Sequence, residues 1–297
     1  MKNLYFKVAD AFYRVVFDND DVNYKAMMPS HGRFFKGVDA PEEDLMFTLF
    51  VGDGRVPDNV EGLELVGEFD SGDCVFGVYR RTEGGYIIRM VDNKGVLCGV
   101  MRTNADISEN EVSLCGNEVQ KRYGLQNCIM VCFAFSGAYH GILLIHASAP
   151  MVNGYAYAFQ GVSGTGKSTH SQLWLKHIEG AELLNDDNPA IRFMDGKTYI
   201  YGTPWSGKTP CYKPLRLPLG AFLKLHQHPE NIIRKLTPIE SYASILTSSS
   251  TMIWDRGSYE GICNTISNIC GVTPCYDLKC RPDEEACMLS SKTIRVK

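Results

Sequence analysis

The feature that most constrains the fold is the octapeptide at residues 161–168, Gly-Val-Ser-Gly-Thr-Gly-Lys-Ser, which fits the pattern GxxxxGK[ST]. It follows a strand-like run, YAYAFQ, and precedes STHSQLWLKHI, whose apolar residues recur at helical spacing. Glycines let the backbone wrap closely, so that N–H groups of the loop and of the helix start point at phosphate oxygens. By chance, the bare pattern occurs in on the order of one in a hundred chains of this length. The motif therefore predicts a strand–loop–helix unit, a P-loop, that binds a nucleotide.

The P-loop interpretation gives each residue of the motif a role. Lys167 would reach the β- and γ-phosphates as a catalytic cation, and Ser168 would ligate Mg²⁺. The expected cofactors are ATP or GTP together with Mg²⁺. The predicted nucleotide-binding residues are Gly161, Ser163, Gly164, Thr165, Gly166, Lys167, Ser168 and Thr169.

A second segment, GTPWSGKT at 202–209, fits the same pattern. It contains Pro204 and is followed by Pro210 and Pro214, which forbid a regular helix there, so we reject it as a phosphate loop. Two interpretations of Lys208 stay open: a solvated surface lysine, favoured about two to one, or a lysine beside a substrate phosphate.

An acidic pair, Asp186 and Asp187, ends the predicted strand AELLN only 19 residues after Lys167. Strand ends beside a P-loop face the nucleotide. Phosphoryl transfer to a hydroxyl needs a carboxylate for Mg²⁺ and a base for the proton, and adjacent acids can divide these tasks. The alternative is a plain turn, because Asp-Asp-Asn-Pro is favourable turn chemistry. Position favours the functional interpretation by roughly three to one.

The pattern of apolar residues predicts two domains of different character. Residues 1–117 contain short apolar or alternating runs separated by turn residues, which predicts a β-rich module. From Glu118 a long, mostly apolar segment predicts a buried helix that ends at Gly141, so we place the domain boundary near residue 117. The expected fold class is α/β, with a P-loop core at 118–297.

Further elements are predicted within the second domain. ILLIHASAP should form one strand, and a hairpin turn follows at Asn153-Gly154. For His146, a packed strand residue is favoured over a catalyst by about two to one. Thr237 begins a capping box for a helix over about 238–246. Two further helices are expected over about 252–270 and after Pro282.

Charge and hydropathy exclude several classes of function. A net charge of -4 and a pI near 6.0 leave no extended basic surface, so we expect no nucleic-acid partner. No apolar run is long enough for a signal peptide or a membrane span, which predicts a cytoplasmic protein with no membrane partner. The 11 cysteines match no zinc-site spacing and are expected to be reduced.

The strings FQGVSGTGKSTHSQLWLKH and AELLNDDNPAIR resemble the nucleotide core shared by HPr kinase/phosphorylase and phosphoenolpyruvate carboxykinase. In those families a similar loop is followed by one helix and a strand that ends in paired Asp residues. ILLIHAS stands where HPr kinases carry a strand with a histidine, here His146. The resemblance covers about residues 118–297 and not the first 117. It implies that Asp187 is a metal ligand and Asp186 the catalytic base, or the reverse.

The motif and the resemblance together predict an ATP- and Mg²⁺-dependent kinase. Its acceptor would be a hydroxyl of an unidentified peptide, protein or metabolite, and an oligomer is possible. Two alternatives stay open: a nucleotide-binding sensor or scaffold without transfer activity, and a carboxykinase-like lyase that acts on a keto acid.

Overall fold

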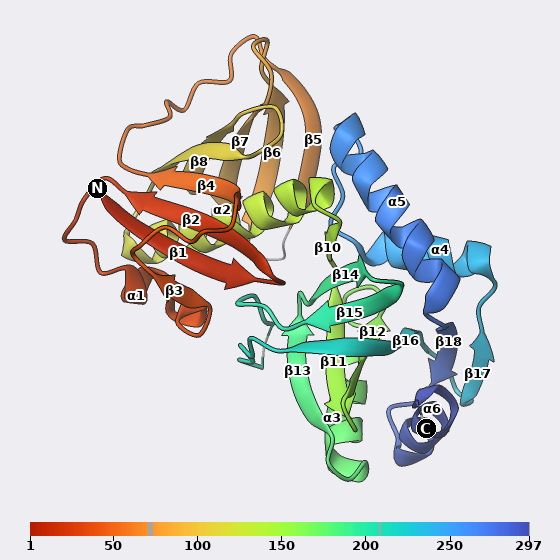
Figure 1. The fold of residues 1–297 in the computed structure, drawn as a ribbon. Helices are drawn as coiled ribbons and strands as arrows, with labels where there is room; N and C mark the ends of the chain where they lie inside the picture. The colour runs from red at the N-terminus through yellow and green to blue at the C-terminus, as the bar shows by residue number, and fades with distance from the viewer. Residues whose placement is uncertain (71–73, 208, 297) are drawn as a thin grey trace. The chain divides into compact units, whose positions relative to one another are not determined.

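The computed structural model describes residues 1–70, 74–207 and 209–296. The chain divides into two compact units (Figure 1). The N-terminal unit comprises Met1–His140 with Met252–Tyr259, and the C-terminal unit comprises Gly141–Thr251 with Glu260–Lys297. Across the described residues, every helix is too short or too polar to serve as a membrane span. Strands and helices of both units make this a mixed α/β protein, as predicted at that level.

The N-terminal unit is built on a nine-stranded sheet with the order β3-β1-β2-β4-β9-β8-β7-β6-β5. Strands β5 to β9 form an antiparallel meander, whereas β4 pairs in parallel with β2 and β9. The strands are β1 (Lys2–Val8), β2 (Ala11–Phe17), β3 (Phe35–Gly37), β4 (Leu45–Val51), β5 (Glu64–Asp70), β6 (Cys74–Arg80), β7 (Tyr86–Asp92), β8 (Leu97–Thr103) and β9 (Glu109–Leu114). Short helices α1 (Tyr24–Met27) and η1 (Pro29–His31) lie between β2 and β3.

Helix α2 (Glu118–Tyr139) covers one face of this sheet and packs on β4, β8 and β9. Asn117 caps the helix, and Gln120 completes a capping box. A Cβ at Gly124 would lie 2.5 Å from the Cys98 carbonyl oxygen, so glycine is what lets the helix approach β8 closely. The compact units therefore divide after His140 and not near residue 117, because α2 buries its apolar face on the N-terminal sheet.

The C-terminal unit contains a second nine-stranded sheet, in which the order β10-β14-β15-β16-β12-β11-β13 is extended by β18 and β17 beside β16. Strands β12, β16 and β18 are parallel neighbours. The strands are β10 (Ile142–Leu144), β11 (Ala147–Val152), β12 (Tyr155–Gln160), β13 (Glu182–Asp187), β14 (Ala190–Met194), β15 (Lys197–Tyr201), β16 (Arg216–Gln227), β17 (Ile232–Lys235) and β18 (Cys275–Cys280). The helices are α3 (Lys167–His177), α4 (Pro238–Ser248), α6 (Glu284–Ile294) and the part of α5 (Arg256–Val272) that follows Tyr259.

Two pairs of strands in this unit form one long antiparallel ribbon. β10 pairs with β14 and β11 with β13, and between these ladders the Ile145 N–H donates to the Pro189 carbonyl at 3.1 Å. The predicted single strand over 142–150 is therefore interrupted at Ile145 and His146. The interruption places His146 next to Asp187, the last residue of β13.

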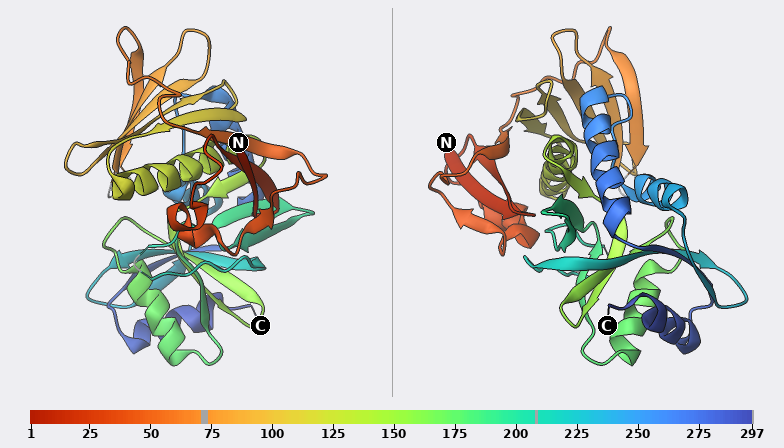
Figure 2. Two further views of the ribbon diagram at one scale, coloured as in Figure 1. Left: turned by 90° about the vertical axis from the view of Figure 1, so that its left-hand side faces the viewer. Right: turned by 45° about the vertical axis from the view of Figure 1, so that its right-hand side comes forward.

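Helices α3 and α6 lie side by side on one face of the sheet (Figure 2). Trp174 of α3 is fully buried, and its ring centroid lies 5.2 Å from those of both Tyr157 and Phe159 on β12. Its indole N–H donates to the Ser290 hydroxyl on α6 at 3.0 Å. Truncating such a residue to alanine costs about 3–5 kcal/mol. This packing fixes both ends of the loop that joins β12 to α3.

Local sequence signals placed most elements of the C-terminal unit correctly. The hairpin turn between β11 and β12 has positive φ at Asn153 and Gly154, as a type I′ turn requires. Helix α4 begins at Pro238 after the predicted capping box of Thr237 and Glu240. Helix α5 begins at Arg256 and not near Met252.

Candidate functional site

The glycine loop, residues 161–166, joins β12 to α3 in a conformation that depends on glycine. Gly161, Gly164 and Gly166 have φ values of 149°, 83° and 100°. A Cβ at Gly161 would lie 2.6 Å from Thr165 Oγ1 and 3.1 Å from the Leu225 carbonyl oxygen. Gly166 is the N-cap residue of α3, and no described side chain caps that end. The first N–H groups of α3, which have no partner within the helix, therefore stay available for an anion.

Lys167, the first residue of α3, folds back over the glycine loop. Its side chain is buried, and Nζ donates to the carbonyl oxygens of Gly161 at 2.8 Å and Val162 at 3.3 Å. Burial lowers the pKa of the ammonium group, while the charges of Asp187 and Asp186 act in the opposite direction. The cation thus sits inside the loop, within electrostatic reach of both acids.

The other predicted loop residues differ in exposure and bonding. Ser163, Ser168 and Thr169 are exposed, whereas Thr165 donates from Oγ1 to the Val162 carbonyl at 2.8 Å. Gln227 Nε2 donates to the Gly164 carbonyl at 3.0 Å and ties the loop to the end of β16.

Asp186 is a buried carboxylate that is only half satisfied. The side chain of Asp186 is 3% exposed, and its Oδ1 accepts a hydrogen bond from the Ser148 hydroxyl at 2.8 Å. Its Oδ2 is buried and has no hydrogen-bond partner among the described residues. A buried carboxylate oxygen without a partner is costly unless a cation meets it.

Asp187 lies closer to solvent, with a side chain that is 34% exposed. Its Oδ2 accepts from Asn188 Nδ2 at 2.6 Å, and its Oδ1 lies 3.8 Å from His146 Nδ1. Burial raises the pKa of Asp187, while His146 and Lys167 act in the opposite direction. The two carboxylates therefore have different surroundings.

His146 is not the packed strand residue that the sequence predicted. Its side chain is 47% exposed, although β10 and the first four residues of β11 on either side are buried, because the ribbon is interrupted at this position. Burial and the charge of Lys167 lower the pKa of His146, and the charge of Asp187 offsets only part of this shift.

The second motif-like segment lies beside the acidic pair. Ser206 forms an isolated β-bridge with Asp187, and the Gly207 N–H donates to the Asp186 carbonyl at 2.8 Å. No helix follows this segment within 209–215, in agreement with its rejection as a phosphate loop. Lys208 lies outside the described residues.

A divalent cation at this site would depend on the ligand for part of its coordination. Among the described residues, no group of three or more His, Cys, Asp or Glu side chains could hold a metal. Mg²⁺ typically takes one or two protein carboxylates or hydroxyls and completes its shell with phosphate oxygens and water. Ser168 and the acidic pair fit such a shared site.

Two residues at the site were not predicted from the sequence, Ser148 and Ser171. Both are buried, and their hydroxyl oxygens lie 2.6 Å apart. The spacing of four residues between Lys167 and Ser171 puts both on one face of α3, which is a signal that the sequence offered. Ser148 carried no such signal, because its neighbour across the ribbon, Asp186, became known only from the strand pairing.

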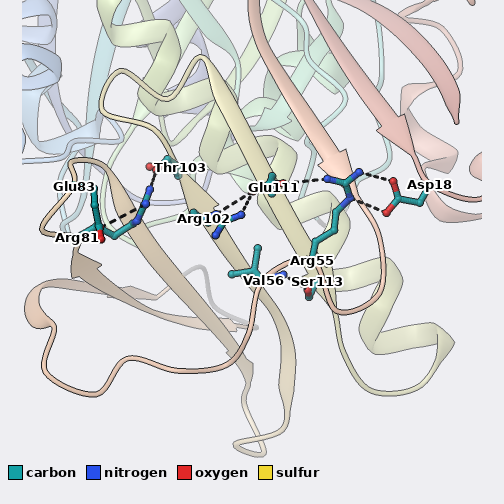
Figure 3. A network of polar contacts seen from close by, with 9 residues as sticks. All are labelled: Asp18, Arg55, Val56, Arg81, Glu83, Arg102, Thr103, Glu111 and Ser113. Carbon is teal, nitrogen blue, oxygen red and sulfur yellow. Dashed lines mark hydrogen bonds and ion pairs between the residues drawn. The ribbon is translucent and has the colours of Figure 1, made fainter.

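A cavity of about 360 Å³ in the N-terminal unit is the main competing site, because its lining includes Arg55, Arg81 and Arg102. These arginines are already paired. Arg55 lies between Asp18 and Glu111, Arg102 pairs with the same Glu111, and Arg81 donates to the Thr103 carbonyl at 3.0 Å (Figure 3). An incoming anion would have to displace these partners, so the cavity is not a prepared anion site.

Comparison with known proteins gives limited similarity to solved structures. No family model matches the chain, and no curated protein matches it. Among solved structures, the HPr(Ser) kinase/phosphatase from Coxiella burnetii is similar over 51% of this chain and 93% of its own, with 11% sequence identity and a TM-score of 0.30.

Proposed function

We propose that the C-terminal unit binds ATP or GTP with Mg²⁺ at the glycine loop and transfers the γ-phosphoryl group to a hydroxyl of a peptide, a protein or a small metabolite. The observation that carries the proposal is the combination of three features: a helix start and a buried carboxylate oxygen that no described side chain caps or bonds, and a buried lysine. Each of these groups is unfavourable by itself, and Mg²⁺ with a polyphosphate would satisfy all three.

Lys167 would bind the β- and γ-phosphates. Its ammonium group now donates to loop carbonyls, which are weak partners for a buried cation. Phosphate oxygens would replace them, and because both partners would then be charged, each hydrogen bond would gain an ion-pair attraction that a neutral carbonyl does not supply. The N–H groups at the start of α3 would complete the anion site.

The surroundings of the two acids favour an exchange of the roles that the sequence suggested. Asp186 is buried against α3 and has one oxygen without a partner among the described residues, which suits a ligand of the nucleotide-bound Mg²⁺. Asp187 is more exposed, has a raised pKa and lies beside His146, which suits a base that receives the proton of an acceptor hydroxyl. We therefore assign Asp186 as the Mg²⁺ ligand and Asp187 as the base that accepts the proton of the acceptor hydroxyl.

The test is calorimetric titration of the full chain with a non-hydrolysable ATP analogue, with and without Mg²⁺. Wild-type protein should bind in a Mg²⁺-dependent manner, and Lys167→Ala should lose at least about 100-fold in affinity, because a buried charge-assisted contact is removed. Lys176→Ala, at an exposed position on the same helix, is the matched control and should bind like wild type. Absence of binding to wild type, or equal binding by Lys167→Ala, would refute the proposed site.

A further inference from the structure

Three buried side chains connect α3 to the acidic pair. The hydroxyl oxygens of Ser171 and Ser148 lie 2.6 Å apart, and Ser148 donates to Asp186 Oδ1 at 2.8 Å. The exposed fractions of Ser171, Ser148 and Asp186 are 0%, 1% and 3%. Solvent therefore does not compete for these hydrogen bonds.

The direction of the hydrogen bonds follows from the carboxylate. An ionised carboxylate only accepts, so the single hydroxyl hydrogen of Ser148 is committed to Asp186. Ser148 must then accept from Ser171, which gives a directed chain from Ser171 through Ser148 to Asp186. Successive hydrogen bonds in a buried chain polarise and strengthen one another.

The side chain of Ser171 forms its hydrogen bond outside its own helix. A helical Ser or Thr often donates to the carbonyl four residues earlier. Helical residues that do so here include Ser241, Thr247, Ser248, Thr265, Ser267 and Thr293. Ser171 instead meets Ser148 across the space between helix and sheet. The contact therefore fixes α3 to β11 at a defined rotation, with Lys167 on the same face one turn earlier.

We propose that Ser148 and Ser171 are positioning residues that hold the Asp186 carboxylate for the nucleotide-bound Mg²⁺. The inference rests on the proposed function. Ser148 fixes Oδ1, so that Oδ2, which has no partner among the described residues, is the oxygen presented to the cation. Ser171 lies on the helix that carries Lys167 and Ser168. The hydrogen bonds from Ser171 through Ser148 therefore fix the position of the Asp186 carboxylate relative to the phosphate-binding groups.

The proposal predicts a specific loss in the variant Ser148→Ala. Residues that orient a metal ligand typically contribute 10- to 100-fold to metal affinity. The apparent Mg²⁺ affinity of the nucleotide complex should therefore fall about 10- to 100-fold, because the carboxylate loses its orienting donor. Affinity for nucleotide without Mg²⁺ should stay within about twofold of wild type, since no phosphate contact is removed. Ser171→Ala should reduce Mg²⁺ affinity by only about two- to fivefold, because the bond from Ser148 to Asp186 remains.

The experiment is calorimetric titration with ATP analogue over a series of Mg²⁺ concentrations, on both serine variants and on Thr273→Val. Thr273 donates to Thr198 at 2.7 Å in a buried hydroxyl pair of the same unit, so this control removes a comparable bond remote from the loop. It should leave Mg²⁺ dependence unchanged.

If Ser148→Ala and Thr273→Val behave alike, the positioning role is refuted and the nucleotide site stands. If wild type binds no nucleotide, or binds it without Mg²⁺ dependence, the proposed function and this inference fail together. Should Ser148→Ala not fold, Ser171→Ala decides alone, since alanine is favourable in a helix; an unchanged Mg²⁺ dependence there overturns the proposal.

Discussion

The arginine network of the N-terminal unit and the glycine loop of the C-terminal unit both gather charged side chains, but they satisfy them differently. In the first, Glu111 pairs with two arginines and Asp18 holds Arg55 from the other side. In the second, Lys167 donates to two loop carbonyls, and one oxygen of Asp186 has no partner among the described residues. Charges that are already paired stabilise a fold, whereas buried groups without adequate partners indicate a ligand.

The largest effect should come from the acid that faces solvent. Asp187→Asn should lower phosphoryl transfer by at least about 100-fold, the usual contribution of a general base, and leave nucleotide affinity nearly unchanged. Asp186→Asn should instead weaken Mg²⁺-dependent binding. Steady-state kinetics and calorimetry on both variants separate the two roles, and Asp195→Asn, in the turn between β14 and β15, is the control. The opposite result would restore the assignment suggested by the sequence.

Transfer should also depend on pH through Asp187. Its pKa is raised by burial, and a base must be deprotonated to act. The turnover rate should therefore be highest at neutral pH. It should fall as the pH drops through the raised pKa of Asp187, which lies above the value of about 3.9 for an ordinary Asp. A pH–rate profile with its acid limb at or below that range would contradict the assignment of the base.

Buried histidines should make both units sensitive to acid. Burial lowers the pKa of His31 in the N-terminal unit to about 3 and that of His170 on α3 to about 4. Below about pH 6.5, protons therefore bind preferentially to the unfolded chain. The contribution of each neutral histidine to stability is fully present above that pH. Below it, the free energy of unfolding falls by about 1.4 kcal/mol per pH unit for each histidine, down to the pKa of the folded state. In urea unfolding between pH 7 and 5, His31→Gln and His170→Gln should each show a shallower slope of the free energy of unfolding against pH than wild type does. Slopes equal to that of wild type would show that these histidines do not cause the loss of stability in acid.

The smallest effect is expected in the arginine network of the N-terminal unit. Glu111→Gln leaves Arg55 and Arg102 without their shared carboxylate and should destabilise the N-terminal unit by about 1 kcal/mol, the scale of partly exposed ion pairs. Nucleotide binding should be unchanged. Glu109→Gln, at an exposed position on the same strand, is the control for the urea-unfolding measurement. A loss of nucleotide affinity in Glu111→Gln would break the distinction between the two regions.

Short-range signals accounted for much of the C-terminal unit. The strand–loop–helix from Tyr155 to His177, the hairpin turn and the capped start of α4 each depend on neighbouring residues, and each was predicted. Helix α2 was also predicted, but not its partner, because the apolar pattern of a helix does not indicate which sheet it will cover. The compact N-terminal unit therefore extends beyond residue 117 and includes α2.

The sequence by itself determined the glycine loop, its lysine and the acidic pair at the end of a strand, because a backbone that needs glycine and a short loop spacing leave few alternatives. Tertiary structure alone decided that His146 is exposed beside Asp187, that Asp186 is buried with one oxygen unpartnered among the described residues, and that Ser148 and Ser171 bridge the helix to the sheet. Those facts depend on where the ribbon is interrupted and on how α3 is rotated. Both are set by packing between residues distant in the chain, which no local pattern records.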